Sequence, residues 1–182
     1  MHKNFNLMDY FLFSYISYMF TYYYIVYFSS LLMSLKQLTL ALLKPDVQRF
    51  INYRKYVESV MRDAQLKIVH CQEFYMTRDH AELFYAEHKG KFFYDRLVNH
   101  MICGPLGVYI LTGNEAISVW RSLLGPTKVY QAVVSQPNSL RGRFGLTDTR
   151  NGFHGSDSQE TAMKEIKFFF PDFNYDDILM NV

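Results

Sequence analysis

The sequence predicts a domain of the α+β class, with a four-stranded antiparallel sheet and helices packed on it. Three observations support this. Short apolar runs of strand length alternate with stretches whose apolar residues recur at helical spacing. The order along the chain is strand, helix, strand, helices, strand, helix, loop, strand, helix. About half of the 182 residues are apolar, enough for one sizeable core. A ferredoxin-like split βαβ arrangement fits this order.

The strands are predicted from short apolar segments bounded by turn or charged residues. QLTLALL lies between Lys36 and Lys44-Pro45, and because Pro45 should end the strand, Lys44 is expected at the strand's C-terminal edge. GVYILT has the same character. The four predicted strands cover residues 37–43, 66–76, 107–112 and 152–154.

The helices are predicted from apolar faces and from their end signals. Gly125-Pro126 is a typical helix stop, and Pro171 ends the last helix. Ser158 is a good N-cap for that helix, and Ser156 with Gln159 also matches the capping-box pattern. The predicted helices cover residues 51–63, 78–88, 92–101, 115–124 and 158–170. Residues 127–150 show little periodicity and are predicted to be a long loop.

Residues 1–35 form an apolar, aromatic extension that precedes the domain predicted at 36–182. No charge occurs from residue 10 to residue 35, long enough for a helix that crosses a bilayer. Seven of these 26 residues are tyrosines, which prefer membrane interfaces. Met33 begins MSLKQLTLALLKPD, which looks like a natural start for a domain. Two interpretations therefore stay open, a membrane anchor through residues 10–35 and translated upstream sequence without a selected role.

Charge and motif absences exclude several function classes. The net charge of +2 is too small for a protein whose surface binds polyanions generally, so any basic site must be local. The two cysteines, Cys71 and Cys103, have neither disulfide nor zinc spacing. The chain contains no G-X-X-X-X-G-K-[ST] phosphate loop, no protein-kinase G-X-G-X-X-G and no H-E-X-X-H.

A candidate reactive histidine lies in TRNGFHGSDSQE, residues 149–160. His154 precedes a predicted helix start, where free backbone N–H groups favour a phosphate. Neutral imidazole can act as a nucleophile near pH 7. Gly155 would let a substrate approach the backbone closely. A lone histidine is more often structural, so both interpretations remain at this point.

The segment before His154 is basic, and the helix after it carries a carboxylate. Arginine's planar fork suits phosphate oxygens, although a solvated loop would have the same composition. Glu165 could orient the imidazole or be an ordinary exposed helix residue. The cations between residues 121 and 150 are Arg121, Lys128, Arg141, Arg143 and Arg150, against one anion, Asp148.

Four segments together carry a family resemblance: ALLKPD, RSLLGPT, SLRGRFG and RNGFHGSDS. With them the chain resembles the nucleoside diphosphate kinases from about Leu38 to Phe170. LLGPTKVY, SLRGRFGLTDTRN and FFPDF are most similar to the divergent nucleoside diphosphate kinase 6 branch. Two departures from the usual pattern occur. Val47 follows K-P-D directly, and the segment from Thr127 to Arg141 is longer than is typical.

The resemblance implies roles for a catalytic group. His154 matches the nucleophile that accepts the γ-phosphate and passes it on. Lys44 matches the lysine that contacts the sugar hydroxyl and the phosphates. Tyr85 matches the tyrosine beside the histidine, and Ser156 with Glu165 matches the pair that positions it.

It also implies a nucleotide-binding group. An aromatic ring should stack on the base, with a leucine packed near it; because every base has a π-face, stacking suits broad nucleotide use. An asparagine should hold the sugar, and two arginines with a threonine should clamp the phosphates. The matching residues are Phe93 and Leu97, Asn151, and Arg121, Thr127 and Arg141, with Lys44 shared between the two groups.

The implied activity is transfer of the γ-phosphate of a nucleoside triphosphate to a nucleoside diphosphate by a ping-pong mechanism through a phosphohistidine at His154. The implied partners are ATP and other nucleoside di- and triphosphates, with Mg²⁺ as cofactor held mainly through the phosphates and no specific nucleic acid. A homo-oligomer is implied, and the longer Thr127–Arg141 segment leaves hexamer formation open. The expected location is cytoplasmic or mitochondrial, with membrane association if the N-terminal segment acts as an anchor. The alternative is a weakly active or inactive nucleotide-binding or interaction module.

Overall fold

The computed structural model describes residues 14–27 and 36–175, and the chain divides into two compact units, residues 1–35 and 36–182. In the first unit, residues 14–27 are helical, and most of their side chains are exposed. Nowhere in residues 14–27 or 36–175 is there a helix long and apolar enough to cross a membrane. Residues 10–13 and 28–35 of the segment expected as a possible anchor lie outside the described residues.

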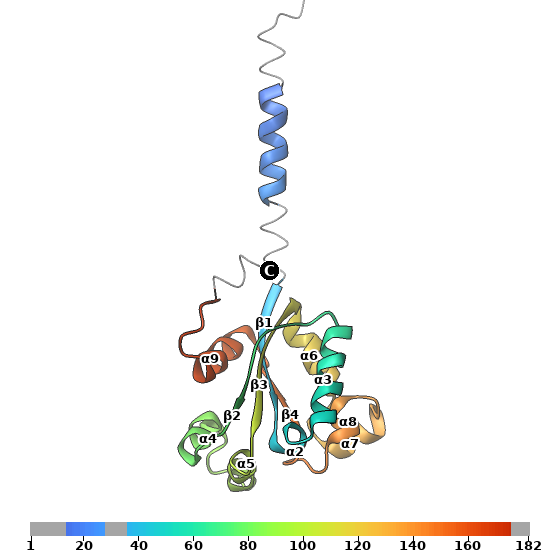
Figure 1. Ribbon diagram of the computed structural model, residues 1–182, viewed down its shortest axis with the longest axis vertical. Coiled ribbons are helices and arrows are strands. Elements are labelled where there is room, and N and C mark those ends of the chain that lie inside the picture. The colour runs from blue at the N-terminus through green and yellow to red at the C-terminus, as the bar shows by residue number, and fades with distance from the viewer. Residues whose placement is uncertain (1–13, 28–35, 176–182) are drawn as a thin grey trace, which may run out of the picture. The chain divides into compact units, whose positions relative to one another are not determined.

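The second unit is built on a four-stranded antiparallel sheet, as the sequence predicts (Figure 1). The strand order is β2-β3-β1-β4, and β1 pairs with both β3 and β4. Helix α3 connects β1 to β2, and α6 lies between β3 and β4, so two βαβ units interlock in one sheet. The strands are β1 Lys36–Leu43, β2 Lys67–Phe74, β3 Leu106–Asn114 and β4 Phe153–Gly155.

Helices cover both faces of the sheet (Figure 1). Alternating side chains of β1 explain the two cores: Leu40 and Leu42 pack on one side, and Ala41 and Leu43 on the other. Helices α4, α5 and α9 cover the first face, and α3 and α6 cover the second. The helices are α2 Pro45–Gln48, α3 Ile51–Asp63, α4 Arg78–Phe84, α5 Tyr94–Met101, α6 Ala116–Leu124, α7 Val129–Ser135, α8 Leu140–Phe144 and α9 Gln159–Phe169, with a 3-10 turn η1 at Ala86–His88.

The prediction of a long loop over residues 127–150 is wrong. It contains α7 and α8, which have seven and five residues. Helices this short give no periodicity over a long window, and the start of α7 is fixed by a residue from further along the chain. The Val129 N–H at the start of α7 donates to Asp148 Oδ1 at 3.0 Å, and the Ser139 hydroxyl caps α8. Pro45 ends β1 as predicted, but it also begins α2, where a missing N–H costs nothing.

Candidate active site

The antiparallel pairing of β1 with β4 brings the K-P-D segment to the histidine. Leu42 lies opposite His154, and Leu43 lies opposite Phe153. The Lys44 N–H then donates to the carbonyl of Gly152 at 2.8 Å, which continues the pairing beyond the strand. Two segments more than a hundred residues apart in the sequence therefore meet at one end of the sheet.

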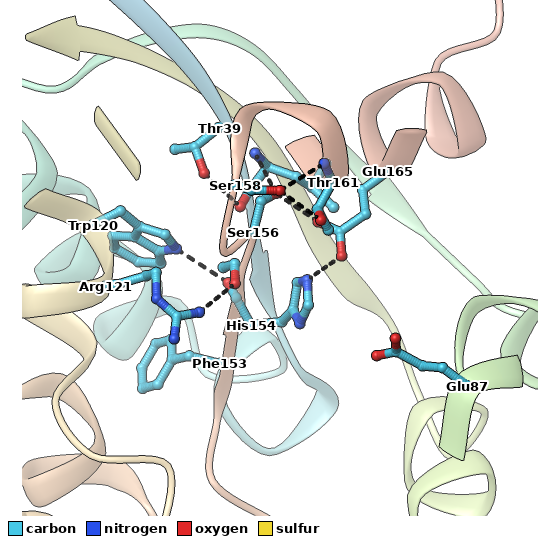
Figure 2. Close-up of polar contacts among 12 residues, drawn as sticks. Thr39, Glu87, Trp120, Arg121, Phe153, His154, Ser156, Ser158, Thr161 and Glu165 are labelled. Atoms are coloured by element: carbon cyan, nitrogen blue, oxygen red, sulfur yellow. Dashed lines mark hydrogen bonds and ion pairs between the residues drawn. The ribbon is translucent and has the colours of Figure 1, made fainter. Parts of the chain in front are cut away.

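His154 is held through one ring nitrogen by a carboxylate from α9 (Figure 2). Its Nε2 lies 2.8 Å from Glu165 Oε1, and the Ser156 hydroxyl donates to Glu165 Oε2 at 2.5 Å. Ser156 Oγ in turn accepts the Leu40 N–H at 3.3 Å, so the chain of contacts ends in the central strand. With Nε2 donating to the carboxylate, Nδ1 keeps a lone pair, and no hydrogen bond to Nδ1 occurs within the described residues.

Ser158, rather than Ser156, caps α9. The Thr161 N–H donates to the Ser158 hydroxyl at 3.1 Å, which confirms the predicted N-cap. The capping-box role suggested for Ser156 and Gln159 is wrong, because the Ser156 side chain is occupied by Glu165 and by the backbone of β1. The two serines thus have separate roles: Ser158 caps the start of α9, and Ser156 lies beside the histidine.

Helix α6 fixes the backbone around the histidine (Figure 2). The Trp120 indole N–H donates to the His154 carbonyl at 3.1 Å, and the Arg121 guanidinium donates to the Gly155 carbonyl at 3.3 Å. A β-carbon on Gly155 would lie 2.5 Å from Trp120 Cδ1. Glycine is required there because the buried indole approaches the backbone so closely.

Lys44 is a buried cation beside the histidine strand. Its side chain is only 4 % exposed and donates to Asn151 Oδ1 at 2.7 Å. Burial lowers the pKa of Lys44 to about 8; the charge of Asp46 opposes this, and that of Arg141 adds to it. Asn151 also donates through Nδ2 to the Thr127 carbonyl at 3.3 Å, so the site joins Lys44, Asn151 and the backbone of Thr127.

Arg141 adds a second, largely buried cation. It donates to the carbonyls of Gly125 at 2.7 Å and Phe153 at 3.4 Å. Burial and the nearby charge of Arg121 lower the pKa of Arg141 to about 10, so it remains protonated at neutral pH. Its Nε is buried and has no partner among the described residues.

An aromatic wall faces the histidine ring. The ring that lies against His154 is Phe84, at a centroid distance of 5.3 Å, and Tyr85 packs edge-on against Phe84 at 5.0 Å. Burial, and then the charge of Glu165, raise the pKa of the Tyr85 phenol above its usual range. The Tyr85 phenol therefore stays protonated at neutral pH. Sequence reasoning missed Phe84, since an aromatic in an apolar helix face gives no separate signal.

Phe93 and Leu97 lie at the start of α5. Phe93 is partly buried, its ring is 5.7 Å from the His88 ring, and the Lys91 ammonium lies 5.9 Å from its centroid. Leu97 is buried in the core beneath it. None of the ring contacts of Phe93 among the described residues involves His154.

A second buried ionisable pair was also missed. His100 Nε2 lies 3.0 Å from Asp46 Oδ1, with side chains only 5 % and 7 % exposed. The K-P-D motif pointed to Asp46, but nothing in the sequence connects it with a histidine 54 positions later. Within residues 14–27 and 36–175, no group of three or more His, Cys, Asp or Glu side chains could hold a metal ion.

The fold and site define a ferredoxin-like α+β domain with an oriented histidine near two buried cations. The family model described as nucleoside diphosphate kinase matches residues 37–175, and the chain belongs to that family. This confirms the resemblance seen in the sequence.

Proteins named nucleoside diphosphate kinase 6 are similar to this chain over most of its length. The chain is 47 % identical over 141 residues to nucleoside diphosphate kinase 6 of Xenopus tropicalis, covering 78 % of this chain and 79 % of the relative. It is 47 % identical over 138 residues to that of Homo sapiens, covering 76 % and 74 %. Identity to nucleoside diphosphate kinase of Ehrlichia canis is 42 % over 135 residues, covering 74 % and 93 %.

Solved structures confirm the fold class. The crystal structure of Aquifex aeolicus nucleoside diphosphate kinase aligns with a TM-score of 0.69 at 33 % identity, covering 74 % of this chain and 95 % of that one. The Encephalitozoon cuniculi nucleoside diphosphate kinase aligns with a TM-score of 0.69 at 25 % identity, covering 75 % and 90 %.

Proposed function

We propose that this protein is an active nucleoside diphosphate kinase that works through a phosphohistidine at His154. The observation that carries the proposal is the contact of His154 Nε2 with Glu165, because it leaves Nδ1 as the nucleophilic nitrogen. Buried cations at Lys44 and Arg141 supply the charge that a triphosphate needs.

The reaction has two half-steps. The Nδ1 lone pair attacks the γ-phosphorus of a nucleoside triphosphate, the bond from that phosphorus to the β,γ-bridging oxygen breaks, and the nucleoside diphosphate leaves. A terminal oxygen of a second diphosphate then attacks the phosphorus, and the N–P bond breaks. The ring gains positive charge as Nδ1 attacks, and Glu165 stabilises it through Nε2–H. One pocket serves both steps, which gives ping-pong kinetics.

The remaining site residues position the nucleotide. Lys44, Arg121 and Arg141 would contact phosphate oxygens, and Asn151 would hold the sugar while it keeps Lys44 in place. The base would stack on the ring of Phe93, above Leu97. Mg²⁺, which the family generally uses, would be held mainly by phosphate oxygens and would offset their charge.

Incubation with γ-labelled ATP tests the proposal. The intact protein should acquire a label that is acid-labile and alkali-stable, and addition of a nucleoside diphosphate should remove it. His154→Ala should not be labelled, whereas His70→Ala should be, because His70 is an exposed residue on edge strand β2. If the intact protein binds ATP but never becomes labelled, the protein is a nucleotide-binding module and the proposal is wrong.

A further inference from the structure

The buried His100–Asp46 pair lies outside the group that contacts the reacting atoms. His100 Nε2 and Asp46 Oδ1 are 3.0 Å apart, and Asp46 Oδ2 is buried without a partner among the described residues. A carboxylate this buried depends on its partner, since an unpaired charge away from water is strongly disfavoured. The contact therefore fixes the position of both side chains.

The pair connects the two halves of the nucleotide site. Asp46 is in the first turn of α2, two residues after Lys44 at the end of β1. His100 is in the last turn of α5, three residues after Leu97 and on the helix that begins after Phe93. A hydrogen bond between Asp46 and His100 thus joins the phosphate-binding lysine's segment to the helix under the base.

The pair also acts on the charge of Lys44. Asp46 raises the pKa of Lys44 against the effect of burial, while the Arg141 charge lowers it. Asp46 faces His100 Nε2. On the other side of the ring, Cys103 Sγ lies 3.8 Å from Nδ1, and Arg49 donates to that sulfur at 3.8 Å. Asp46 therefore lies between two groups. His100 orients its carboxylate, and the charge of that carboxylate raises the pKa of Lys44.

We propose that His100 is a positioning residue for the nucleotide: through Asp46 it holds the Lys44 segment in register with α5. This rests on the proposed function for the identity of the ligand. The pair touches no reacting atom, so its loss should weaken nucleotide binding and spare phosphoryl transfer at saturation.

Two variants of His100 separate the hydrogen bond from the packing. His100→Phe keeps a ring of similar size without an N–H, and His100→Gln keeps a donor. Affinity for a fluorescent ADP analogue is measured by titration well below each variant's melting temperature, together with single-turnover discharge of phosphohistidine. We expect His100→Phe to weaken affinity about tenfold, the effect of one hydrogen bond to a charged group, and His100→Gln to retain affinity within about threefold of wild type. The discharge rate at saturating ADP should stay within about threefold for both.

Asp46→Asn supplies a test by pH. Without the Asp46 charge the pKa of Lys44 falls further below about 8, so Lys44 loses its proton at lower pH. The loss of affinity relative to wild type should therefore be larger near pH 7.5 than near pH 6. A pair with only a structural role would give the same ratio at both. Asp95→Asn, exposed on α5, is the control and should bind like wild type.

Four results would overturn the inference. They are wild-type affinity in His100→Phe, an equal affinity loss in His100→Phe and the donor-retaining His100→Gln, a slower saturated discharge at unchanged affinity, and the same Asp46→Asn affinity ratio near pH 6 and pH 7.5. If His100→Phe does not fold, His100→Gln and Asp46→Asn still decide. The two proposals fail separately, because a wild-type protein that binds the analogue without becoming phosphorylated refutes only the kinase activity. The affinity comparison can still be made in such a protein.

Discussion

Glu165→Gln is expected to slow phosphorylation of His154 by about tenfold while the domain stays folded. The carboxylate lies 2.8 Å from His154 Nε2 and accepts the Ser156 hydroxyl with its other oxygen. Glutamine can keep one acceptor but removes the charge. A hydrogen bond to a charged group is worth about 1.5–3 kcal/mol and a neutral one about 0.5–1.5 kcal/mol. The difference, roughly 1–1.5 kcal/mol, is about tenfold in rate.

The rate is measured by rapid mixing with saturating γ-labelled ATP, followed by quenching in base and counting of labelled protein. Glu160→Gln is the matched control: it is on the same helix, but its pair with Lys164 is largely exposed and worth little. Melting temperatures exclude a folding effect. A Glu165→Gln rate within twofold of wild type, or an equal loss in Glu160→Gln, would refute the claim that the carboxylate stabilises charge on the ring.

Three further predictions concern the neighbouring groups. Arg141→Ala should lower kcat/KM by an amount equivalent to about 2–4 kcal/mol of transition-state stabilisation, like the loss of an oxyanion donor. A kcat/KM near the wild-type value in steady-state kinetics would reject the phosphate-clamp role. Because the pKa of Lys44 is lowered to about 8, its ammonium loses its proton as pH rises through that value. ADP affinity measured by titration should therefore fall above about pH 8, and a flat profile to pH 10 would contradict the role of Lys44. Gly155→Ala should destabilise the domain by about 1–3 kcal/mol through overlap with Trp120, visible as a lower melting temperature, and should also reduce labelling; an unchanged melting temperature would contradict the steric argument.

The predicted elements that proved reliable were those with a strong local pattern. Strands β1 and β3 and helices α3, α6 and α9 fall within two residues of their predicted ends, because apolar runs and capping residues act locally. Helices α7 and α8 were missed, since Val129 depends on Asp148 far along the chain for its cap. The capping-box interpretation of Ser156 failed for a related reason: the hydroxyl donates instead to the carboxylate of Glu165, nearly two turns into α9.

By itself the sequence determined the α+β class, the family, and which residue types could form a phosphate-binding histidine site. The fold class follows from local apolar patterns, and the family and the candidate site residues follow from sequence motifs and their spacing. Only the tertiary structure decided which ring nitrogen of His154 is held, how deeply Lys44 is buried, and that His100 meets Asp46. Each of these depends on the pairing of strands or packing of helices distant in sequence. Burial and hydrogen-bond partners arise only when those segments pack together. They determine the protonation of Lys44 and the orientation of the His154 ring.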